Sequence, residues 1–147
     1  MTLEIRAATV ADLPAVLQLY QQSGLDSDAS LPLAAAEQWL QQLEQYPSYT
    51  LWVAVLAEKV AGTFTLLIMD NLIHQGSPSG VVEAVAVDPQ WQGQGIGKQM
   101  IQFAIAQCRT AGCYKLALST NLKRDRAHAF YQSLGFKKHG YSFLVEL

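Results

Sequence analysis

Cysteine and histidine are scarce in this sequence, and each shortage excludes a class of protein. Two cysteines occur, Cys108 and Cys113, which is too few and too close together for a disulfide framework. The three histidines are scattered, and no Cys/His spacing of a structural zinc site is found. We therefore expect no bound metal, and we expect both cysteines to be buried apolar residues.

Positive charge and long apolar runs are lacking as well. The net charge of -2 gives no electrostatic reason to expect a nucleic-acid partner. No stretch approaches the roughly 18 uninterrupted apolar residues of a membrane-spanning helix. The segment from Met1 to Val10 contains Glu4 and Arg6 and lacks the apolar core of a signal peptide. A cytoplasmic protein without membrane attachment is the resulting expectation.

The sequence does contain enough apolar material for one core. Its 147 residues are 50% hydrophobic and 15% charged, values typical of a compact globular protein rather than a disordered one. This length fits one domain, and no repeat, low-complexity tract or linker interrupts it. We predict a single domain over residues 1–147 that folds alone or as a homodimer.

Apolar periodicity predicts α and β elements in mixed order along the chain. Segments rich in β-branched and aromatic residues predict strands over 3–7, 49–56, 60–68, 81–87, 114–118 and 136–145. Helical spacing predicts helices from Leu13 and over 33–46, 95–108 and 124–134. Thr9 and Asp12 resemble a capping box before the first helix, and Ala57-Glu58-Lys59 suits a hairpin turn. The fold class is α/β, with a mixed sheet and flanking helices.

A glycine-rich turn follows the strand Val81 to Val87, whose valines and alanines are expected of a strand covered on both faces. Asp88-Pro89 ends this strand, and three glycines lie between Gln92 and Lys98, where a helix begins. Glycines let the backbone approach a ligand, while the free amides of a first helical turn point outward. Such a turn suits a pyrophosphate.

Two familiar phosphate-binding patterns do not fit the turn. A P-loop needs glycine where Gln92 stands and Ser or Thr where Gln99 follows Lys98. The dinucleotide pattern needs a third glycine where Lys98 or Met100 stands. The turn therefore belongs to another class of phosphate site.

The residues do match the pattern Q/R-x-x-G-x-G/A, filled by Gln92, Gly95 and Gly97. Here the chain resembles the GCN5-related N-acetyltransferase (GNAT) family. The resemblance continues in Asn121 and in the segment from Ala127 to Phe136, which looks like the last helix of that family. The opening segment, Ile5 to Leu13, is similar to its usual start. The resemblance is weakest from about Ser23 to Tyr46.

The resemblance implies an acyl-CoA N-acyltransferase fold, in which the sheet is splayed between its fourth and fifth strands. The pantetheine of acetyl-CoA would lie in this opening like an added strand. The backbone groups that would bind it belong to Val85, Ala86 and Val87. The pyrophosphate would meet the amides of Gln92, Gly93, Gln94, Gly95, Ile96, Gly97 and Lys98. The Lys98 ammonium would add a charge-assisted contact, and Asn121 would bond pantetheine unless it is a turn residue.

The same resemblance implies transfer of the acetyl group of acetyl-CoA to a primary amine by direct attack through a tetrahedral intermediate. A backbone amide near Val85 would bind the oxyanion, and Tyr131, matching the general-acid tyrosine of the family, would protonate the sulfur. Tyr131 could instead be helix core. Glu83 is the only ionisable residue of its strand, and a buried carboxylate is costly. General base and structural carboxylate both stay open for it.

The acceptor amine is left open by two resemblances within the family. Gln92 to Lys98 with Gly112 to Leu116 looks like glucosamine-phosphate acetyltransferases. Ser119 to Arg124, with Ala127-His128 and Phe130-Tyr131, is similar to aminoalkylphosphonate acetyltransferases. Both point to a small anionic amine, which Lys123, Arg124 or Arg126 could meet. Protein N-termini, lysines, polyamines and aminoglycosides also stay open. So does a non-catalytic acyl-CoA-binding or regulatory module, although the presence of both Glu83 and Tyr131 argues against it.

Overall fold

The fold is described from a computed structural model, which covers residues 2–26 and 29–147. The chain divides into two compact units, Met1–Ala117 and Leu118–Leu147, and each is described by itself. Together the described residues form five strands and four α-helices. The strands are β1 (Glu4–Ala7), β2 (Tyr49–Leu56), β3 (Lys59–Met69), β4 (Ser79–Val87) and β5 (Lys115–Ala117). The helices are α1 (Leu13–Gln22), α2 (Leu33–Leu43), α3 (Ile96–Thr110) and α4 (Asp125–Ser133).

The first unit is built on a five-stranded sheet in the order β1-β2-β3-β4-β5. The first four strands pair antiparallel, and β5 pairs parallel with β4. The mixed sheet predicted from the sequence is therefore confirmed. So is the hairpin between β2 and β3, whose turn consists of Ala57 and Glu58 between the paired residues Leu56 and Lys59.

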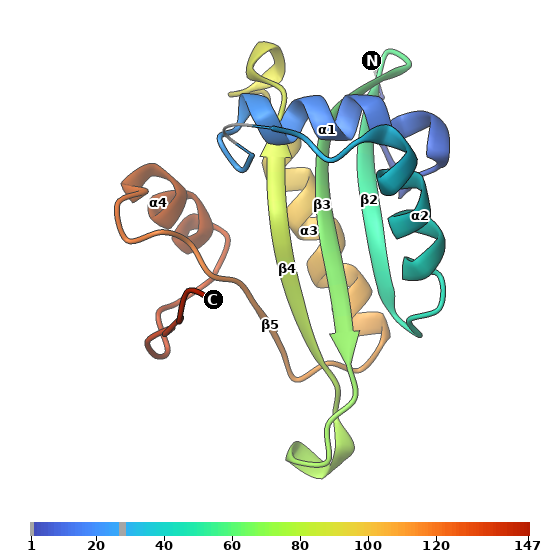
Figure 1. Ribbon diagram of the computed structural model, residues 1–147. Coiled ribbons are helices and arrows are strands. Elements are labelled where there is room, and N and C mark those ends of the chain that lie inside the picture. Colours follow the sequence, from blue (N-terminus) through green and yellow to red (C-terminus); the bar gives the residue numbers. More distant parts are fainter. Residues whose placement is uncertain (1, 27–28) are drawn as a thin grey trace. The chain divides into compact units, whose positions relative to one another are not determined.

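Helices cover both faces of this sheet (Figure 1), with α1 and α2 on one face and α3 on the other. On the first face, buried residues of α1, α2 and β2 pack together: Leu13, Val16, Ala36, Leu43, Leu51 and Val53. On the other face, the Phe103 ring of α3 meets Trp52 and Phe64 edge-on, with ring centroids 4.7 and 6.5 Å away. Apolar burial of this kind is the main stabilising contribution to a fold.

Gly62 of β3 allows α3 to pack closely against the sheet. A Cβ atom at this position would lie 2.8 Å from the Met100 sulfur and 3.3 Å from the backbone oxygen of Ala86. Any larger residue would push Met100 away from β3. Because Met100 follows the first turn of α3, this contact helps fix where that helix begins relative to β4.

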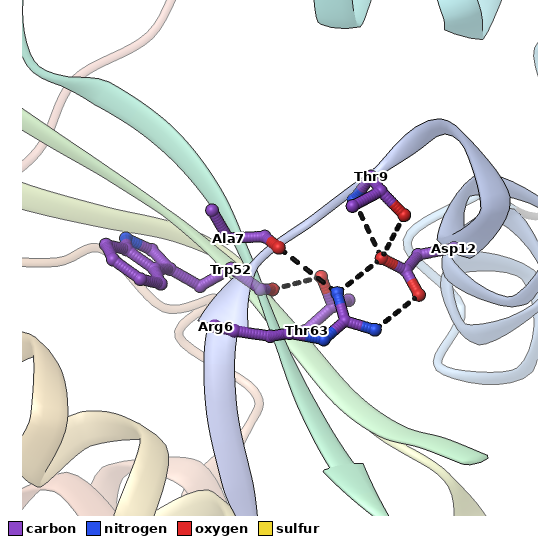
Figure 2. Close-up of polar contacts among 6 residues, drawn as sticks. All are labelled: Arg6, Ala7, Thr9, Asp12, Trp52 and Thr63. Atoms are coloured by element: carbon purple, nitrogen blue, oxygen red, sulfur yellow. Dashed lines mark hydrogen bonds and ion pairs between the residues drawn. The ribbon is translucent and has the colours of Figure 1, made fainter. Parts of the chain in front are cut away.

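The predicted capping box is confirmed (Figure 2). The Asp12 carboxylate accepts hydrogen bonds from the Thr9 backbone amide at 2.7 Å and from the Thr9 hydroxyl at 3.1 Å. The same carboxylate pairs with the Arg6 guanidinium of β1. The first strand and the start of α1 are therefore joined through one side chain.

The second unit contains α4 but no strand, so the prediction of a strand over Phe136 to Val145 is wrong. A strand exists only where its backbone groups pair with a neighbour. In the described residues this segment pairs with none, and its apolar side chains after Phe136 are exposed, Tyr141 by 91% and Phe143 by 92%. Gly135 does end α4 as predicted, with a φ of 94°.

Candidate functional site

Strand β4 contains a β-bulge at the residues where the sequence predicts ligand contacts. The pairing with β3 passes from Thr63 opposite Ala86 to Thr65 opposite Glu83. Phe64 alone therefore faces two residues of β4, Ala84 and Val85. A bulge of this kind leaves one residue out of the ladder and bends the strand. Backbone groups at Ala84 and Val85 are thereby released from regular pairing.

Ala84, in the bulge, has a strained backbone conformation. Its φ is 51°, in the left-handed region, which costs a residue with a Cβ atom about 1–2 kcal/mol. Such strain persists only where the surroundings enforce it, and it clusters at functional sites. The residue is not glycine, so the bulge must be maintained by contacts rather than by backbone freedom.

The outer edge of β4 is paired over a short length only. Strand β5 pairs with Ser79, Gly80 and Val81 and with no later residue of β4 in the described part of the chain. From Val82 to Val87, β4 is paired by β3 alone. This separation of the fourth and fifth strands after a few residues agrees with the splayed sheet predicted from the sequence.

The Glu83 side chain is exposed, so the expectation of a buried carboxylate on β4 is wrong. Among the described residues its carboxylate forms no hydrogen bond or ion pair, which does not favour the structural role. Its backbone oxygen does accept a hydrogen bond of 3.1 Å from the Thr65 hydroxyl.

The glycine turn lies between the end of β4 and the start of α3. Asp88 begins it, because its carboxylate accepts a hydrogen bond of 2.8 Å from the Gln90 amide and caps a short 3-10 turn. The Gln92 side-chain amide donates to the Val87 backbone oxygen at 3.4 Å. Gln92, predicted to bind a ligand, thus also ties the turn back to the strand.

Gly93 and Gly95 have left-handed conformations, with φ values of 77° and 82°. No other atom lies within 4 Å of the position a Cβ would take at either residue. Glycine is therefore required by the backbone conformation, and the space beside the turn is open. Gly95 caps α3 without any side-chain hydrogen bond to the helix start.

The first amides of α3 have no partner within the helix. The first intrahelical bond, 3.0 Å long, runs from the Gln99 amide to the Gly95 oxygen, so the amides of Ile96, Gly97 and Lys98 precede the ladder. Together with the positive end of the helix dipole, such amides bind anions. The Ile96 side chain is buried, so this residue can contribute only its backbone, whereas the Lys98 side chain is exposed.

Tyr131 and Asn121 lie in the second unit. The Tyr131 ring contacts Phe130 and Phe136, with centroids 5.2 and 5.7 Å away, and burial raises the pKa of its hydroxyl. The Asn121 side-chain oxygen accepts from the Lys123 amide at 2.9 Å, and its backbone oxygen lies 2.8 Å from His128 Nε2. Asn121 therefore takes part in a turn, and its side-chain nitrogen can still act as a donor, so its bond to pantetheine stays a prediction.

The structure thus gathers the predicted ligand residues of the first unit along one path from β4 to α3. The bulge at Ala84 was not predicted, because no glycine marks it. One sequence signal could have drawn attention to it. Thr63 and Thr65 place two hydroxyls in the apolar run of β3, and both side chains are buried, with exposures of 0% and 5%.

Among residues 2–26 and 29–147, no three side chains of the His, Cys, Asp and Glu types group as a metal site requires. None of the described helices combines the length and hydrophobicity needed to cross a bilayer.

The first unit is thus a mixed sheet whose bulged fourth strand has a partly unpaired edge and leads through a glycine turn into a helix. A sequence model of the acetyltransferase (GNAT) family matches residues 13–136. The chain therefore belongs to the GNAT family, and it is an acetyltransferase.

Individual proteins agree with this assignment. The chain is 33% identical over 137 residues to aminoglycoside N(6')-acetyltransferase type 1 of Stenotrophomonas maltophilia, covering 91% of this chain and 86% of the relative. It is 35% identical over 89 residues to the aminoalkylphosphonate N-acetyltransferase of Salmonella typhimurium, covering 60% of this chain and 57% of that protein. The structure of a putative acetyltransferase from Agrobacterium tumefaciens superposes with a TM-score of 0.91 at 33% identity, covering 98% of this chain and 99% of that one.

Proposed function

We propose that this acetyltransferase transfers the acetyl group of acetyl-CoA to a primary amine of a small molecule. The observation that carries this proposal is the start of α3. There, uncapped amides follow two left-handed glycines with open space beside them. These features fit the diphosphate of a coenzyme A thioester.

Coenzyme binding would use backbone groups more than side chains. The amides from Gln92 to Lys98 would hold the diphosphate, and the exposed Lys98 ammonium would add a charge-assisted contact. The pantetheine would pair with the edge of β4 from Val85 to Val87, where β5 no longer pairs. Asn121 would donate its side-chain amide to the pantetheine.

The chemistry requires three further functions from the chain. The Val85 amide, in the bulge, would stabilise negative charge on the acetyl carbonyl oxygen. Glu83, whose exposed carboxylate is open to solvent, would accept a proton from the amine, directly or through water. Tyr131 would donate a proton to the departing sulfur; a tyrosine hydroxyl is protonated at neutral pH, and burial raises the pKa of this one further.

A single catalytic domain over residues 1–147 is part of this proposal. One family model matches residues 13–136 and so includes residues of both compact units, which supports a single domain. A homodimer and a cytoplasmic location stay predictions of the sequence.

The acceptor is proposed to be a small amine rather than a protein. The named relatives above acetylate an aminoglycoside and an aminoalkylphosphonate, and the aminoglycoside enzyme matches more of the chain. Lys123, Arg124 and Arg126 are all exposed and could meet an anionic acceptor. An aminoglycoside is polycationic, so the two acceptor types make opposite demands on these residues.

A thiol-release assay with acetyl-CoA tests the proposal. Its acceptor panel contains an aminoglycoside, glucosamine 6-phosphate, an aminoalkylphosphonate, a polyamine and a peptide with a free N-terminus and lysine. We expect turnover with at least one small amine and little with the peptide. Coenzyme binding without turnover on any amine, or turnover confined to the peptide, would contradict it.

A further inference from the structure

The strained bulge of β4 requires a contact that maintains it, because alanine, unlike glycine, disfavours the positive φ that Ala84 adopts. The orientation of the peptide group between Glu83 and Ala84 determines the geometry of the bulge. Because a peptide is planar, the direction of the Glu83 carbonyl sets the plane from which the φ of Ala84 is measured. The φ and ψ of Ala84 in turn set where the Val85 amide points.

Thr65 contacts this peptide group directly. It stands opposite Glu83 in the pairing of β3 with β4, and its hydroxyl donates a hydrogen bond of 3.1 Å to the Glu83 backbone oxygen. The side chain is 5% exposed, so water competes little for the bond. A bulge disrupts the ladder locally, and the hydroxyl supplies a donor at that point.

Thr63 provides a comparison within the same strand. It is also buried, at 0% exposure, and its hydroxyl also donates to a backbone oxygen, that of Trp52 at 2.8 Å (Figure 2). Trp52 lies on β2, on the opposite side of β3 from the bulge. Two threonines two residues apart thus make the same type of bond, and only that of Thr65 reaches β4.

We propose that Thr65 is a positioning residue for acetyl transfer. Its hydroxyl holds the Glu83 carbonyl, and thereby the left-handed conformation of Ala84, so that the Val85 amide is directed at the substrate. The inference rests on the proposed function, because it concerns the amide that would stabilise the carbonyl oxygen. Losing the bond should therefore slow the chemical step and leave coenzyme affinity nearly unchanged, since the diphosphate is held at the start of α3.

The test compares Thr65→Val, which keeps the shape and removes the donor, with Thr65→Ser, which keeps the donor. Thr63→Val is the matched control for loss of a buried hydroxyl. For each protein, kcat and KM are measured with the best small amine of the panel, and coenzyme A affinity is measured by calorimetry. Thermal unfolding confirms that each variant is folded.

We expect kcat to fall at least about tenfold in Thr65→Val, because removing an oxyanion donor outright costs about 10²–10³-fold. Thr65→Ser should stay within about threefold of the wild type and Thr63→Val within about twofold, with coenzyme affinity within about twofold throughout. If Thr65→Val does not fold, Thr65→Cys is compared with Thr65→Ser instead. Cysteine has nearly the shape of serine, but its thiol is only a weak hydrogen-bond donor.

A second measurement links the effect to Ala84. Glycine adopts a positive φ without strain, so Ala84→Gly should restore a large part of the kcat lost in Thr65→Val. Equal kcat values for Thr65→Val and Thr63→Val, or a serine variant as slow as the valine variant, would overturn the inference. A wild-type protein that neither binds coenzyme A nor turns over would instead contradict the proposed function, which separates the two failures.

Discussion

Arg6 and Asp12 form a two-point ion pair, in which Nη1 lies 2.7 Å from Oδ2 and Nη2 lies 3.0 Å from Oδ1. The Asp12 side chain is 9% exposed and that of Arg6 36%. Since Asp12 also accepts the Thr9 amide, one carboxylate holds β1 and the start of α1 together.

We expect Asp12→Asn to lower the free energy of unfolding by about 2 kcal/mol, because the charge-assisted bonds to Arg6 are lost and a capping contact is weakened. Urea denaturation measures the change. Asp70→Asn, at an exposed position, is the control and should stay within about 0.5 kcal/mol of the wild type. A loss no larger than that of the control would show that the pair does not stabilise the fold.

The same pair predicts a pH dependence. Hydrogen bonding from Arg6, and then from Thr9, lowers the pKa of Asp12 below its usual value, and burial opposes this in part. A lowered pKa stabilises the folded state above the unfolded-state pKa of about 3.9. That stabilisation is lost as the pH falls through the folded-state value. The difference between wild type and Asp12→Asn should therefore be constant above about pH 5 and shrink in more acidic buffer. A difference that stays undiminished as the pH is lowered would contradict the assignment.

The hairpin turn carries strain that can be relieved. Ala57 and Glu58 have φ values of 49° and 65°, the conformation of a type I′ turn, which favours Asn and Gly. Glu58→Gly should raise the free energy of unfolding by about 1 kcal/mol. Glu44→Gly is the matched control, since Glu44 is an exposed residue with right-handed helical angles. Glycine there should destabilise by about 0.5–1 kcal/mol, and effects of the same sign at both positions would contradict the turn geometry.

Tyr131→Phe separates the general acid from the helix-core interpretation. If the hydroxyl protonates sulfur, kcat should fall by about 10²-fold or more while coenzyme affinity changes by less than about twofold. Tyr141→Phe, at an exposed tyrosine of the same unit, should leave both unchanged. Steady-state kinetics measures kcat, and calorimetry measures the coenzyme affinity. Unchanged kcat would return Tyr131 to a packing role.

Glu83→Gln tests the proposed base. A glutamine cannot accept the proton of the amine, so activity near neutral pH should fall and the shape of the pH–rate profile should change. Glu44→Gln, which removes an exposed carboxylate at the C-terminal end of α2, serves as the control. Identical profiles for the wild type and Glu83→Gln would mean that Glu83 does not act as the base.

Most of the fold could be predicted because its local signals agree with its tertiary structure. Strand β2 has the predicted bounds, and the hairpin and the capping box were both marked by short-range residue patterns. Such patterns depend only on neighbours in the sequence. The strand predicted over Phe136 to Val145 depended on a distant partner, which no local pattern specifies.

The site was predictable in its backbone framework and less so in its side chains. Glycines in the turn indicate that its backbone can adopt a positive φ. Ala84 also has a positive φ, which alanine disfavours and which the sequence therefore does not indicate. The exposure of Glu83 could not be read from a run of valines and alanines, because coverage of a strand face depends on where helices end. The sequence therefore predicts the glycine turn between β4 and α3 but not the bulge or its contact with Thr65.

The proposed function depends most directly on binding of a diphosphate by the glycine turn. Calorimetry with coenzyme A and with pantetheine, which lacks the diphosphate and nucleotide, measures it for the wild type and for Gly95→Ala. Gly24→Ala is the control, because Gly24 has a similar φ of 78° and the same open surroundings. We predict that coenzyme A binds at least about 100-fold more tightly than pantetheine, a difference of about 2.7 kcal/mol. We also predict that Gly95→Ala, but not Gly24→Ala, reduces this preference. Equal affinities for the two ligands, or no binding of coenzyme A at all, would contradict the account.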